Sequence, residues 1–294
     1  MLLRAKDGSI GGMKTVLVTG ASSGIGEATA LRMARAGWRV FAGVRNVERF
    51  ALKEPGLVPV ELDVAKEESI AAAHAEIVTA LNGAGLDALV NNAGIGQVLP
   101  MEYTTPEDLR RIFSINVFGL LAVTQAFLPE LRQARGRIVN LSSIGALITI
   151  PFGGTLCATK HCVEAFSDAM RMEFLPEGIE VIAIRPAAIH SPAADKLAAE
   201  GEKTIAALPA EGQARYGGLL RHFLAKMLED ENAGSPPDVV AEVIEKALTV
   251  AKPDAHYLAG KHAHILGFLG RWLPDRVRDQ VLLRKLGLPH EVVD

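Results

Sequence analysis

The sequence Thr19-Gly20-Ala21-Ser22-Ser23-Gly24-Ile25-Gly26 joins a short apolar run, 15–19, to a segment with apolar residues at helical spacing, 25–36. This order predicts a buried strand, a tight turn and a helix. Gly20 permits the sharp turn, Gly24 lets the backbone approach a pyrophosphate, and Gly26 lets the helix pack against the strand. Because a helix N-terminus offers free N–H groups and a favourable dipole, we interpret the turn as a phosphate-binding site rather than as a simple connection.

The alternation of strand and helix continues along the chain. No linker rich in Pro, Gly or Ser divides it. Alternation of this kind implies parallel strands with right-handed crossovers, covered by helices on both faces. We therefore predict one α/β domain over residues 14–294. The predicted strands are 15–19, 39–44, 58–62, 87–90, 136–141 and 179–184, and the predicted helices are 25–36, 67–81, 106–132 and 155–175.

Three segments depart from this alternation. Residues 1–13 are predicted to be a flexible N-terminal arm. Residues 191–235 follow the C-terminal end of a strand, where ligands bind in open parallel sheets, so we predict a substrate lid there, with a surface insertion as the alternative. Residues 256–294 form an apolar tail at helical spacing with interleaved arginines. Packing on the core or a partner subunit is the favoured interpretation of the tail; a peripheral membrane helix and a substrate funnel are the alternatives.

Composition narrows the class of protein. The 294 residues carry a net charge of −3 without a long basic run, which argues against nucleic-acid binding. We expect no signal peptide and no transmembrane segment, because neither the N-terminus nor any later run is apolar for long enough. Cys157 and Cys162 are expected to be free thiols in a reducing cytoplasm. They lack a second pair at metal-binding spacing, so no metal site is expected.

Five separately spaced motifs support a family resemblance. They are the Gly-x-x-x-Gly-x-Gly turn, Asn91-Asn92-Ala93-Gly94 after a strand, Asn116 on a helix, Ser143 after another strand, and Lys160 in a helix. In these features the chain resembles the short-chain dehydrogenase/reductase family from about Lys14 to Ser191. The resemblance implies a single Rossmann-type domain, with a doubly wound sheet of seven parallel strands, that binds a nicotinamide dinucleotide and forms a homodimer or homotetramer.

Segments 152–154, 164–167 and 174–179 look most similar to the hydroxysteroid and retinol dehydrogenase branch. This resemblance implies a lipophilic alcohol or ketone as the substrate, by analogy at the level of the family.

The resemblance also implies which residues hold the nucleotide. Those of the turn would contact the phosphates, two would lie at the adenine, three would follow the adenine ribose, and the remainder would surround the nicotinamide. In this order they are Gly20, Ser22, Ser23, Gly24, Ile25 and Gly26; Asp63 and Val64; Asn91, Ala93 and Gly94; and Lys160, Pro186, Ala187, Ile189 and Ser191.

The choice of cofactor depends on the residues after the second strand. An acidic residue there would bond the ribose 2′-hydroxyl, whereas an arginine would pair with a 2′-phosphate. The chain has Val44 where the acid is expected, followed by Arg45. We infer NADP(H); the alternative is that Arg45 is a solvated surface charge.

The catalytic set has a gap. In the resembling family a tyrosine hydroxyl exchanges a proton with the substrate oxygen, a lysine lowers its pKa, a serine holds the oxygen, and an asparagine anchors a water. Asn116, Ser143 and Lys160 match the last three roles. The tyrosine position is Leu156, thirteen residues after Ser143 and four before Lys160.

A leucine cannot donate, accept or titrate, so Leu156 predicts impaired or altered redox turnover. The change is either natural or an engineered knockout. A redox-silent NADP-binding protein and a non-redox isomerase or cyclase are the alternative functions. Ala187 and Ser191 also depart from the family pattern, and their position near the nicotinamide makes natural divergence more credible.

Overall fold

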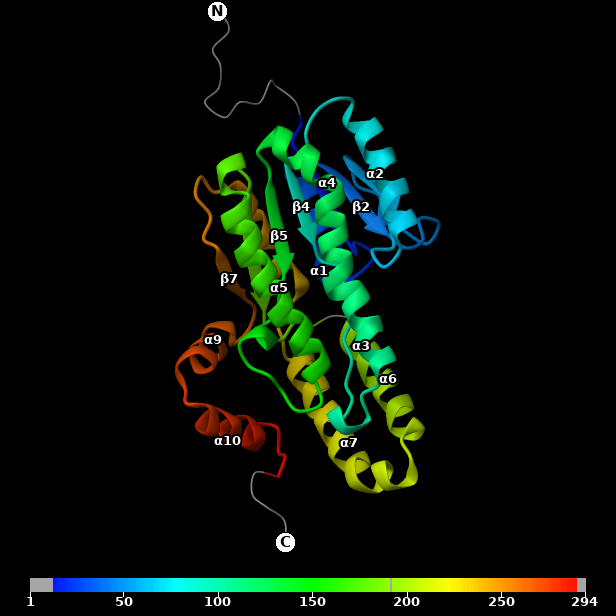
Figure 1. Cartoon of the computed structure of the whole chain (residues 1–294), viewed down its shortest axis with the longest axis vertical. Helices are drawn as coiled ribbons and strands as arrows, with labels where there is room; N and C mark the ends of the chain where they lie inside the picture. The colour runs from blue at the N-terminus through cyan, green and yellow to red at the C-terminus, as the bar shows by residue number, and fades with distance from the viewer. Residues whose placement is uncertain (1–12, 191, 290–294) are drawn as a thin grey trace, which may run out of the picture.

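The centre of the fold is a sheet of seven parallel strands (Figure 1). The computed structural model describes residues 13–190 and 192–289, with the backbone alone over 192–198. The strand order is β3-β2-β1-β4-β5-β6-β7. The strands are β1 (Thr15–Thr19), β2 (Arg39–Val44), β3 (Leu57–Glu61), β4 (Ala88–Asn91), β5 (Arg137–Leu141), β6 (Glu180–Pro186) and β7 (His256–Ala259). The predicted doubly wound α/β fold is thereby confirmed.

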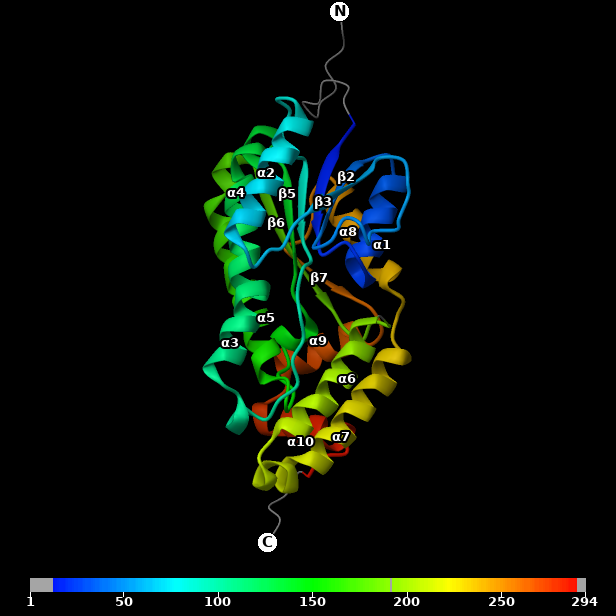
Figure 2. The same cartoon turned by 90° about the vertical axis from the view of Figure 1, so that its right-hand side faces the viewer.

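Helices cover both faces of the sheet because the strands are apolar on both sides. Figure 2 shows α1 (Gly24–Arg35) and α8 (Pro237–Thr249) on one face. On the opposite face lie α2 (Glu67–Leu81), α4 (Leu120–Ala134) and α5 (Gly154–Glu173). Each layer has its own buried core: Val18 and Val90 point to the first, and Leu17 and Leu89 to the second. This alternation is what a strand buried on both faces requires.

The predicted long helix over 106–132 is helical throughout but changes its winding. It consists of α3 (Pro106–Phe113), a π-helical segment, η2 (Ser114–Gly119), and α4. The whole run Pro106–Ala134 is long and apolar enough to cross a membrane by length and composition. Phe127 and Leu131 are nevertheless buried on the sheet, as expected for a core helix of a folded domain.

The last third of the chain adds four further helices at the lower end in Figure 1. Residues 191–235, predicted to be a lid, contain α6 (Pro192–Ala207) and α7 (Ala210–Asn232), which pack against each other. The tail predicted to be helical over 256–294 begins instead with β7, which completes the sheet beside β6, and then contains α9 (Ala263–Trp272) and α10 (Asp275–Lys285). Short 3-10 turns complete the fold: η1 (Met101–Tyr103), η3 (Ile144–Ala146) and η4 (Leu175–Glu177). Most of the predicted arm, residues 1–12, lies outside the described residues.

Candidate nucleotide-binding and catalytic site

The predicted site residues gather at the carboxyl edge of the sheet. Between β1 and β4 the order of the strands reverses, because β2 and β3 continue on one side of β1 and β4 to β7 on the other. A reversal of this kind leaves a crevice outside the carboxyl ends of the strands. The glycine-rich turn follows β1, Arg45 follows β2, and Ser142 and Ser143 follow β5.

The turn after β1 has the backbone that its glycines predict. Gly20 and Gly24 have φ values of +67° and +59°, a region that side chains with a Cβ rarely adopt. A Cβ on Gly26 would lie 2.3 Å from the carbonyl oxygen of Gly20. The N-cap residue of α1, Ser23, makes no side-chain capping bond. The first N–H groups of α1 are therefore left for an anion such as a phosphate.

Thr19 and Asn92, which were not assigned an individual role from the sequence, hold the turn against the loop after β4. The Asn92 side-chain amide donates to the carbonyl oxygen of Thr19 at 2.9 Å, and the Thr19 hydroxyl accepts from the backbone N–H groups of Asn92 and Ala93, both at 3.0 Å. In the sequence, Thr19 belongs to the glycine-rich turn and Asn92 to the motif Asn91-Asn92-Ala93-Gly94. A function as internal braces could not be read from that.

Asn91 lies at the same edge, but its side chain is turned into the protein. Its Nδ2 donates to Thr124 Oγ1 and to Asn140 Oδ1, both at 2.9 Å, and Asn140 donates in turn to Ser167 at 2.9 Å. All four residues are buried. Any contact of Asn91 with an adenine ribose would therefore use its backbone.

The predicted adenine end is bordered by Arg45, Asp63 and Val64. The turn reaches the end of β2 directly, since Ala21 N–H donates to the Gly43 carbonyl at 3.0 Å. Arg45 is exposed and has no hydrogen bond or ion pair to any other described residue. Asp63 caps its own loop by accepting from Ala65 N–H at 3.1 Å, and Val64 is buried. An unpaired guanidinium at this position is free to meet an added phosphate.

Ser143, Leu156 and Lys160 lie around the start of α5 and the end of β5. The Ser143 hydroxyl accepts from Gly145 N–H at 3.0 Å at the beginning of η3. Lys160 Nζ donates to the carbonyl oxygen of Leu141, the last residue of β5, at 2.7 Å. Leu156 is half-buried one helical turn before Lys160, on the same side of α5. The lysine ammonium therefore keeps two donor hydrogens beyond its bond to Leu141.

Asn116 lies within the π-helical segment η2 and is buried. Its Oδ1 accepts from Ile95 N–H at 2.8 Å, and its Nδ2 donates to the Ile95 carbonyl at 2.9 Å and to Thr159 Oγ1 at 3.1 Å. The Thr159 hydroxyl donates to the carbonyl oxygen of Leu156 at 2.7 Å. A π-turn widens the helix and is common at functional sites. Asn116 thus ties the loop after β4 to the turn of α5 that carries Leu156.

A charged network lies behind the lysine. Arg185 on β6 donates to both carboxylate oxygens of Glu164, at 2.9 and 2.8 Å, and His256 Nε2 lies 3.3 Å from the same carboxylate. Burial opposes ionisation of Glu164, but the hydrogen bonds from His256 and Arg185 outweigh it and lower its pKa to about 2. Burial also lowers the pKa of Lys160 to about 8, against the attraction of Glu164 one turn away.

The predicted nicotinamide end is anchored to two later segments. Ala187 N–H donates to the Ala259 carbonyl at 2.9 Å, and Ile189 is buried and bridges to Ser235 ahead of α8. Pro186 ends β6 and is also buried. Ser191 lies outside the described residues.

Three aromatic side chains, Phe152, Tyr216 and Phe223, form an apolar wall between the start of α5 and α7. Phe152, just ahead of α5, has a φ of +61°, which is strained for a bulky residue. Its ring meets Tyr216 and Phe223 of α7 edge-on at 6.3 and 5.5 Å, and its carbonyl accepts from Leu99 N–H at 2.9 Å. The Tyr216 hydroxyl donates to Glu102 at 2.7 Å. Tyr216 is therefore engaged on the surface and supplies no replacement for a hydroxyl at Leu156.

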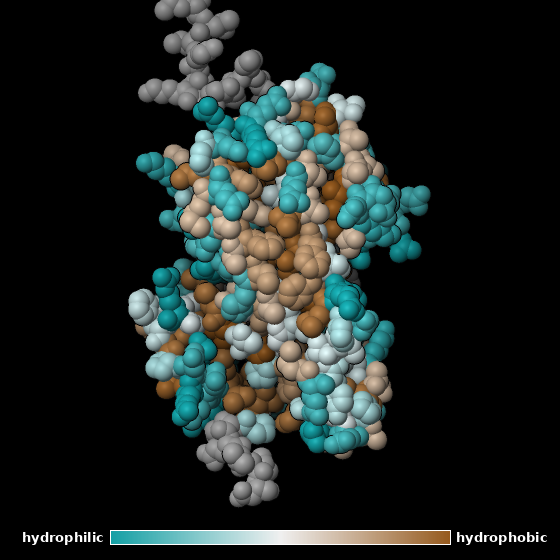
Figure 3. Space-filling model, viewed as in Figure 1, coloured by the Kyte–Doolittle hydropathy of each residue, from teal (hydrophilic) through white to brown (hydrophobic). Residues whose placement is uncertain are grey.

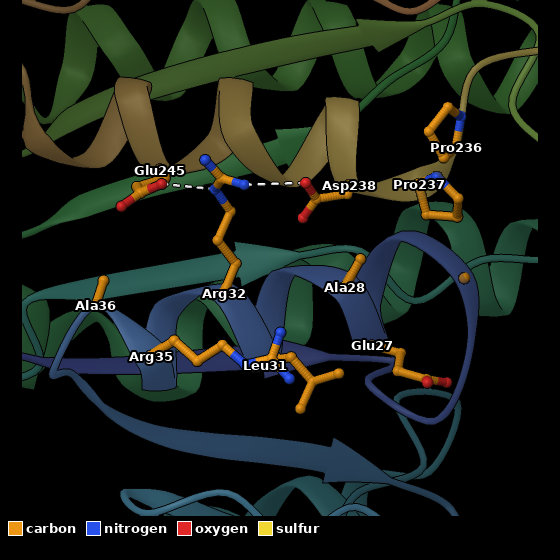
Figure 4. A pocket seen from close by; sticks show the side chains of 11 residues that line it. Glu27, Ala28, Leu31, Arg32, Arg35, Ala36, Pro236, Pro237, Asp238 and Glu245 are labelled. Atoms are coloured by element: carbon orange, nitrogen blue, oxygen red, sulfur yellow. Dashed lines mark hydrogen bonds and ion pairs between the residues drawn. The ribbon is translucent and has the colours of Figure 1, made fainter.

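A groove of about 820 Å³ lies between α1 and α8 (Figure 4). Arg32 crosses it and bonds Glu245 at 2.6 Å and Asp238 at 3.0 Å. Its guanidinium is thus neutralised by two carboxylates. The groove touches the nucleotide turn only at Gly24 and contains none of the predicted catalytic residues.

Comparisons with known proteins agree with this geometry. The family model described as short chain dehydrogenase matches residues 14–202. Retinol dehydrogenase 5 of Homo sapiens is 34% identical over 95% of this chain and 90% of its own. The 17-beta-hydroxysteroid dehydrogenase type 2 of Homo sapiens is 32% identical over 93% of this chain and 74% of its own.

Solved structures give the same result. A short-chain dehydrogenase from Streptomyces avermitilis is similar with a TM-score of 0.73 and 27% identity, over 95% of this chain and 98% of its own. A short-chain dehydrogenase from Burkholderia cenocepacia in complex with NADP has a TM-score of 0.68 and 25% identity, over 94% of this chain and 98% of its own.

Proposed function

Because the chain belongs to the short-chain dehydrogenase family, a family of oxidoreductases, we propose that it binds NADP(H) on the scaffold of a carbonyl/alcohol oxidoreductase whose proton-transfer step is impaired at Leu156. One observation carries the proposal. The glycine turn, Arg45 and Ser143 follow the carboxyl ends of strands, and Lys160 donates to the last residue of β5, while the side chain one turn before Lys160 has no polar atom.

The residues at the carboxyl edge fit a dinucleotide phosphate. Gly26 leaves no room for a Cβ between α1 and the turn after β1, so the helix begins close against the turn. The N-terminus of α1 has no side-chain cap that would compete with a phosphate. Arg45 supplies the unpaired cation for a 2′-phosphate. When bound, the nicotinamide supplies or accepts a hydride. Its ribose hydroxyls would find a donor in Lys160, whose ammonium is fixed by Leu141.

Reduction of a ketone adds a hydride to the carbonyl carbon and a proton to the oxygen. Ser143 would hold that oxygen through its hydroxyl, and the proton would come from a hydroxyl at position 156, which Leu156 lacks. Loss of a positioned general acid typically lowers the rate by about 10²–10⁴-fold. We therefore infer that this chain binds the cofactor but turns over slowly, with water or a neighbouring donor replacing the missing hydroxyl.

We propose a lipophilic alcohol or ketone as the substrate. The names of two similar proteins refer to retinol and to hydroxysteroids. In this chain Phe152, Tyr216 and Phe223 form an apolar wall between the start of α5 and α7, and Leu99 and Ile205 extend the same buried cluster. The α6–α7 pair would then act as the predicted lid over the substrate.

A redox-silent NADP-binding protein is the second candidate. The observation that favours it is Leu156 itself, because nothing in the nucleotide part of the site is lost with the hydroxyl. A non-redox isomerase or cyclase on the same scaffold remains a third proposal, which would use the shape of the apolar wall rather than hydride transfer.

We further propose that the protein is a cytoplasmic homodimer or homotetramer. Cys157 and Cys162 are free thiols, as a reducing compartment favours. Apolar side chains colour the surface over α4 and α5 in Figure 3, and Phe118, ahead of α4, is exposed. Light scattering after size-exclusion chromatography tests the assembly: Phe118→Glu would lower the mass to that of a monomer if this face joins the subunits.

One pair of measurements tests the proposed function. NADPH fluorescence is titrated with the protein, and NADPH consumption is followed with lipophilic ketones. Tight NADPH binding with slow turnover supports the proposal, and tight binding with none supports the redox-silent protein. Product formation without NADPH consumption supports the non-redox enzyme. An absence of NADPH binding would contradict both the oxidoreductase and the redox-silent NADP-binding protein.

A further inference from the structure

The tail exposes an unusual number of apolar side chains. We call the outward face of α9 and α10 the tail surface; it consists of Ile265, Phe268, Trp272, Val277 and Val281. The first three are 60%, 61% and 67% exposed and lie on one side of α9, at positions i, i+3 and i+7. Val277 and Val281 continue the surface on α10, one helical turn apart. Large aromatic side chains exposed together usually mark a contact surface.

The same face is basic. Residues 263–288 contain five arginines and lysines against two aspartates, in a chain whose net charge is −3. Arg278 and Lys285 have carboxylate partners, Asp275 and Asp230. No carboxylate of the described residues pairs with the other three tail arginines, Arg271, Arg276 and Arg284. Exposed apolar groups and unpaired cations therefore share one surface, and Figure 3 shows brown and teal side chains mixed at the lower left, where Figure 1 places these helices.

The opposite side of the two helices is fixed to the protein. Gly267 and Gly270 allow α9 to lie close to Leu258 and Leu147, where a Cβ would meet neighbouring atoms at 2.9 and 2.8 Å. Leu282 is buried, and beyond α10 the Leu286 carbonyl lies 3.0 Å from His222 Nε2. The apolar side chains of the tail surface are therefore presented on a rigid support and are not a consequence of loose packing.

We propose that the tail surface binds the interface of a membrane that contains anionic lipids. Interfacial helices place aromatic and aliphatic groups at the boundary of headgroups and acyl chains, and cationic side chains add electrostatic attraction to acidic headgroups. A second copy of this chain fits less well. A two-fold contact would pair this surface with a copy of itself, and so bring together two segments in each of which five basic residues outnumber two aspartates.

If the proposed function holds, membrane binding by the tail surface would also bring a lipophilic substrate close to the catalytic site. A cavity of about 330 Å³ lies beneath Phe268 and Trp272 and is also lined by Leu147 and Leu258. Leu147 directly follows η3, the turn that begins at Ser143. A lipophilic substrate held in the bilayer would thus reach the protein close to the serine that would hold its oxygen.

Vesicle binding tests the apolar part. The full chain is mixed with sedimentable vesicles of phosphatidylcholine alone or with about one third phosphatidylserine. The wild-type protein should sediment with the mixed vesicles, and a triple variant should bind at least 10-fold more weakly. Two exposed apolar residues outside the tail provide a control, which should bind like the wild type. The test variant is Ile265→Gln/Phe268→Gln/Trp272→Gln, and the control is Met172→Gln/Leu175→Gln, at positions 62% and 68% exposed.

A second pair of variants tests the charges. Each basic group near an anionic surface is worth about 1 kcal/mol, so removing three should weaken binding to the mixed vesicles on the order of 100-fold. Three exposed cations elsewhere provide the control with equal loss of charge. The test variant is Arg271→Gln/Arg276→Gln/Arg284→Gln, and the control is Arg49→Gln/Lys53→Gln/Arg111→Gln.

Three outcomes would overturn the proposal: no sedimentation with the mixed vesicles, equal binding by test and control variants, or a dimer that Phe268→Gln dissociates. Circular dichroism of each variant reports its folding. The sedimentation assay requires neither NADPH nor turnover, so failure of the proposed enzymatic function and failure of membrane binding are distinguished.

Discussion

Lys160→Met should make the protein more stable at neutral pH while it weakens the nucleotide site. Burial lowers the pKa of the ammonium from 10.5 to about 8, which means that the folded state disfavours the charged form. That difference corresponds to about 3 kcal/mol. Methionine has no charge to bury but leaves the Leu141 carbonyl without its 2.7 Å donor, which costs about 1–2 kcal/mol. We expect a net gain of about 1–2 kcal/mol in the free energy of unfolding at pH 7.

The pH dependence has a definite sign. Between pH 8 and 10.5 the unfolded wild-type chain binds more protons at Lys160 than the folded chain, so the stability of the wild type rises with pH. The advantage of Lys160→Met should therefore be largest below pH 8 and disappear toward pH 10. Urea unfolding followed by circular dichroism at pH 7 and pH 9.5 measures this, with the exposed Lys53→Met as the control. A variant less stable than the wild type by the same amount at both pH values would refute the reasoning.

Three further predictions concern the same edge of the sheet. Gly26→Ala should abolish NADPH fluorescence enhancement, because its methyl group would lie 2.3 Å from the Gly20 carbonyl. The control, Gly218→Ala, places its methyl group in open space on α7 and should leave the enhancement unchanged. NADPH binding by both variants would contradict the assignment of the turn. Arg45→Gln should weaken NADPH about 10–100-fold and leave NADH unchanged, as measured by calorimetry against Arg49→Gln. Glu164→Gln should lower the free energy of unfolding at pH 7 by about 2–3 kcal/mol, because the folded protein lowers the pKa of this carboxylate to about 2. The stability difference between wild type and variant should shrink as pH falls from about 4.5 to 2. A stability difference that is constant with pH would contradict this prediction.

Periodicity and glycine spacing were sufficient to predict six strands and most of the helices. The seventh strand, β7, lies in the tail that was predicted to be helical, and a sheet of seven strands was implied by the family resemblance alone. Buried strands such as 15–19 are continuous apolar runs, and they leave a clear pattern. The π-helical winding at Asn116 was not predictable, because it depends on the bond of that side chain to Ile95 rather than on local propensity. Helix α8 was not identified either, although Pro236 lies at its N-cap and Pro237 is its first residue.

The site was predictable where a motif specifies backbone geometry. It was not predictable where a side chain can face either the ligand or the protein interior. The turn at Gly20 and Gly24 has the positive φ values that its glycines indicate. Asn91 shows the limit: from its motif it was assigned to the ribose, whereas its amide lies in a buried network with Asn140. The strained backbone of Phe152 also left no trace in the sequence, since it is held by tertiary contacts with α7.

We propose that a single missing hydroxyl at position 156 separates nucleotide binding from turnover. The direct test compares NADPH-dependent reduction of a lipophilic ketone by the wild type, Leu156→Tyr and Leu156→Phe. Phenylalanine restores the ring without the hydroxyl and controls for the change of shape. We predict equal NADPH affinity in all three proteins and a rate about 10²–10⁴-fold higher for Leu156→Tyr alone. Equal rates for the tyrosine and phenylalanine variants, or no gain with tyrosine, would contradict the claim.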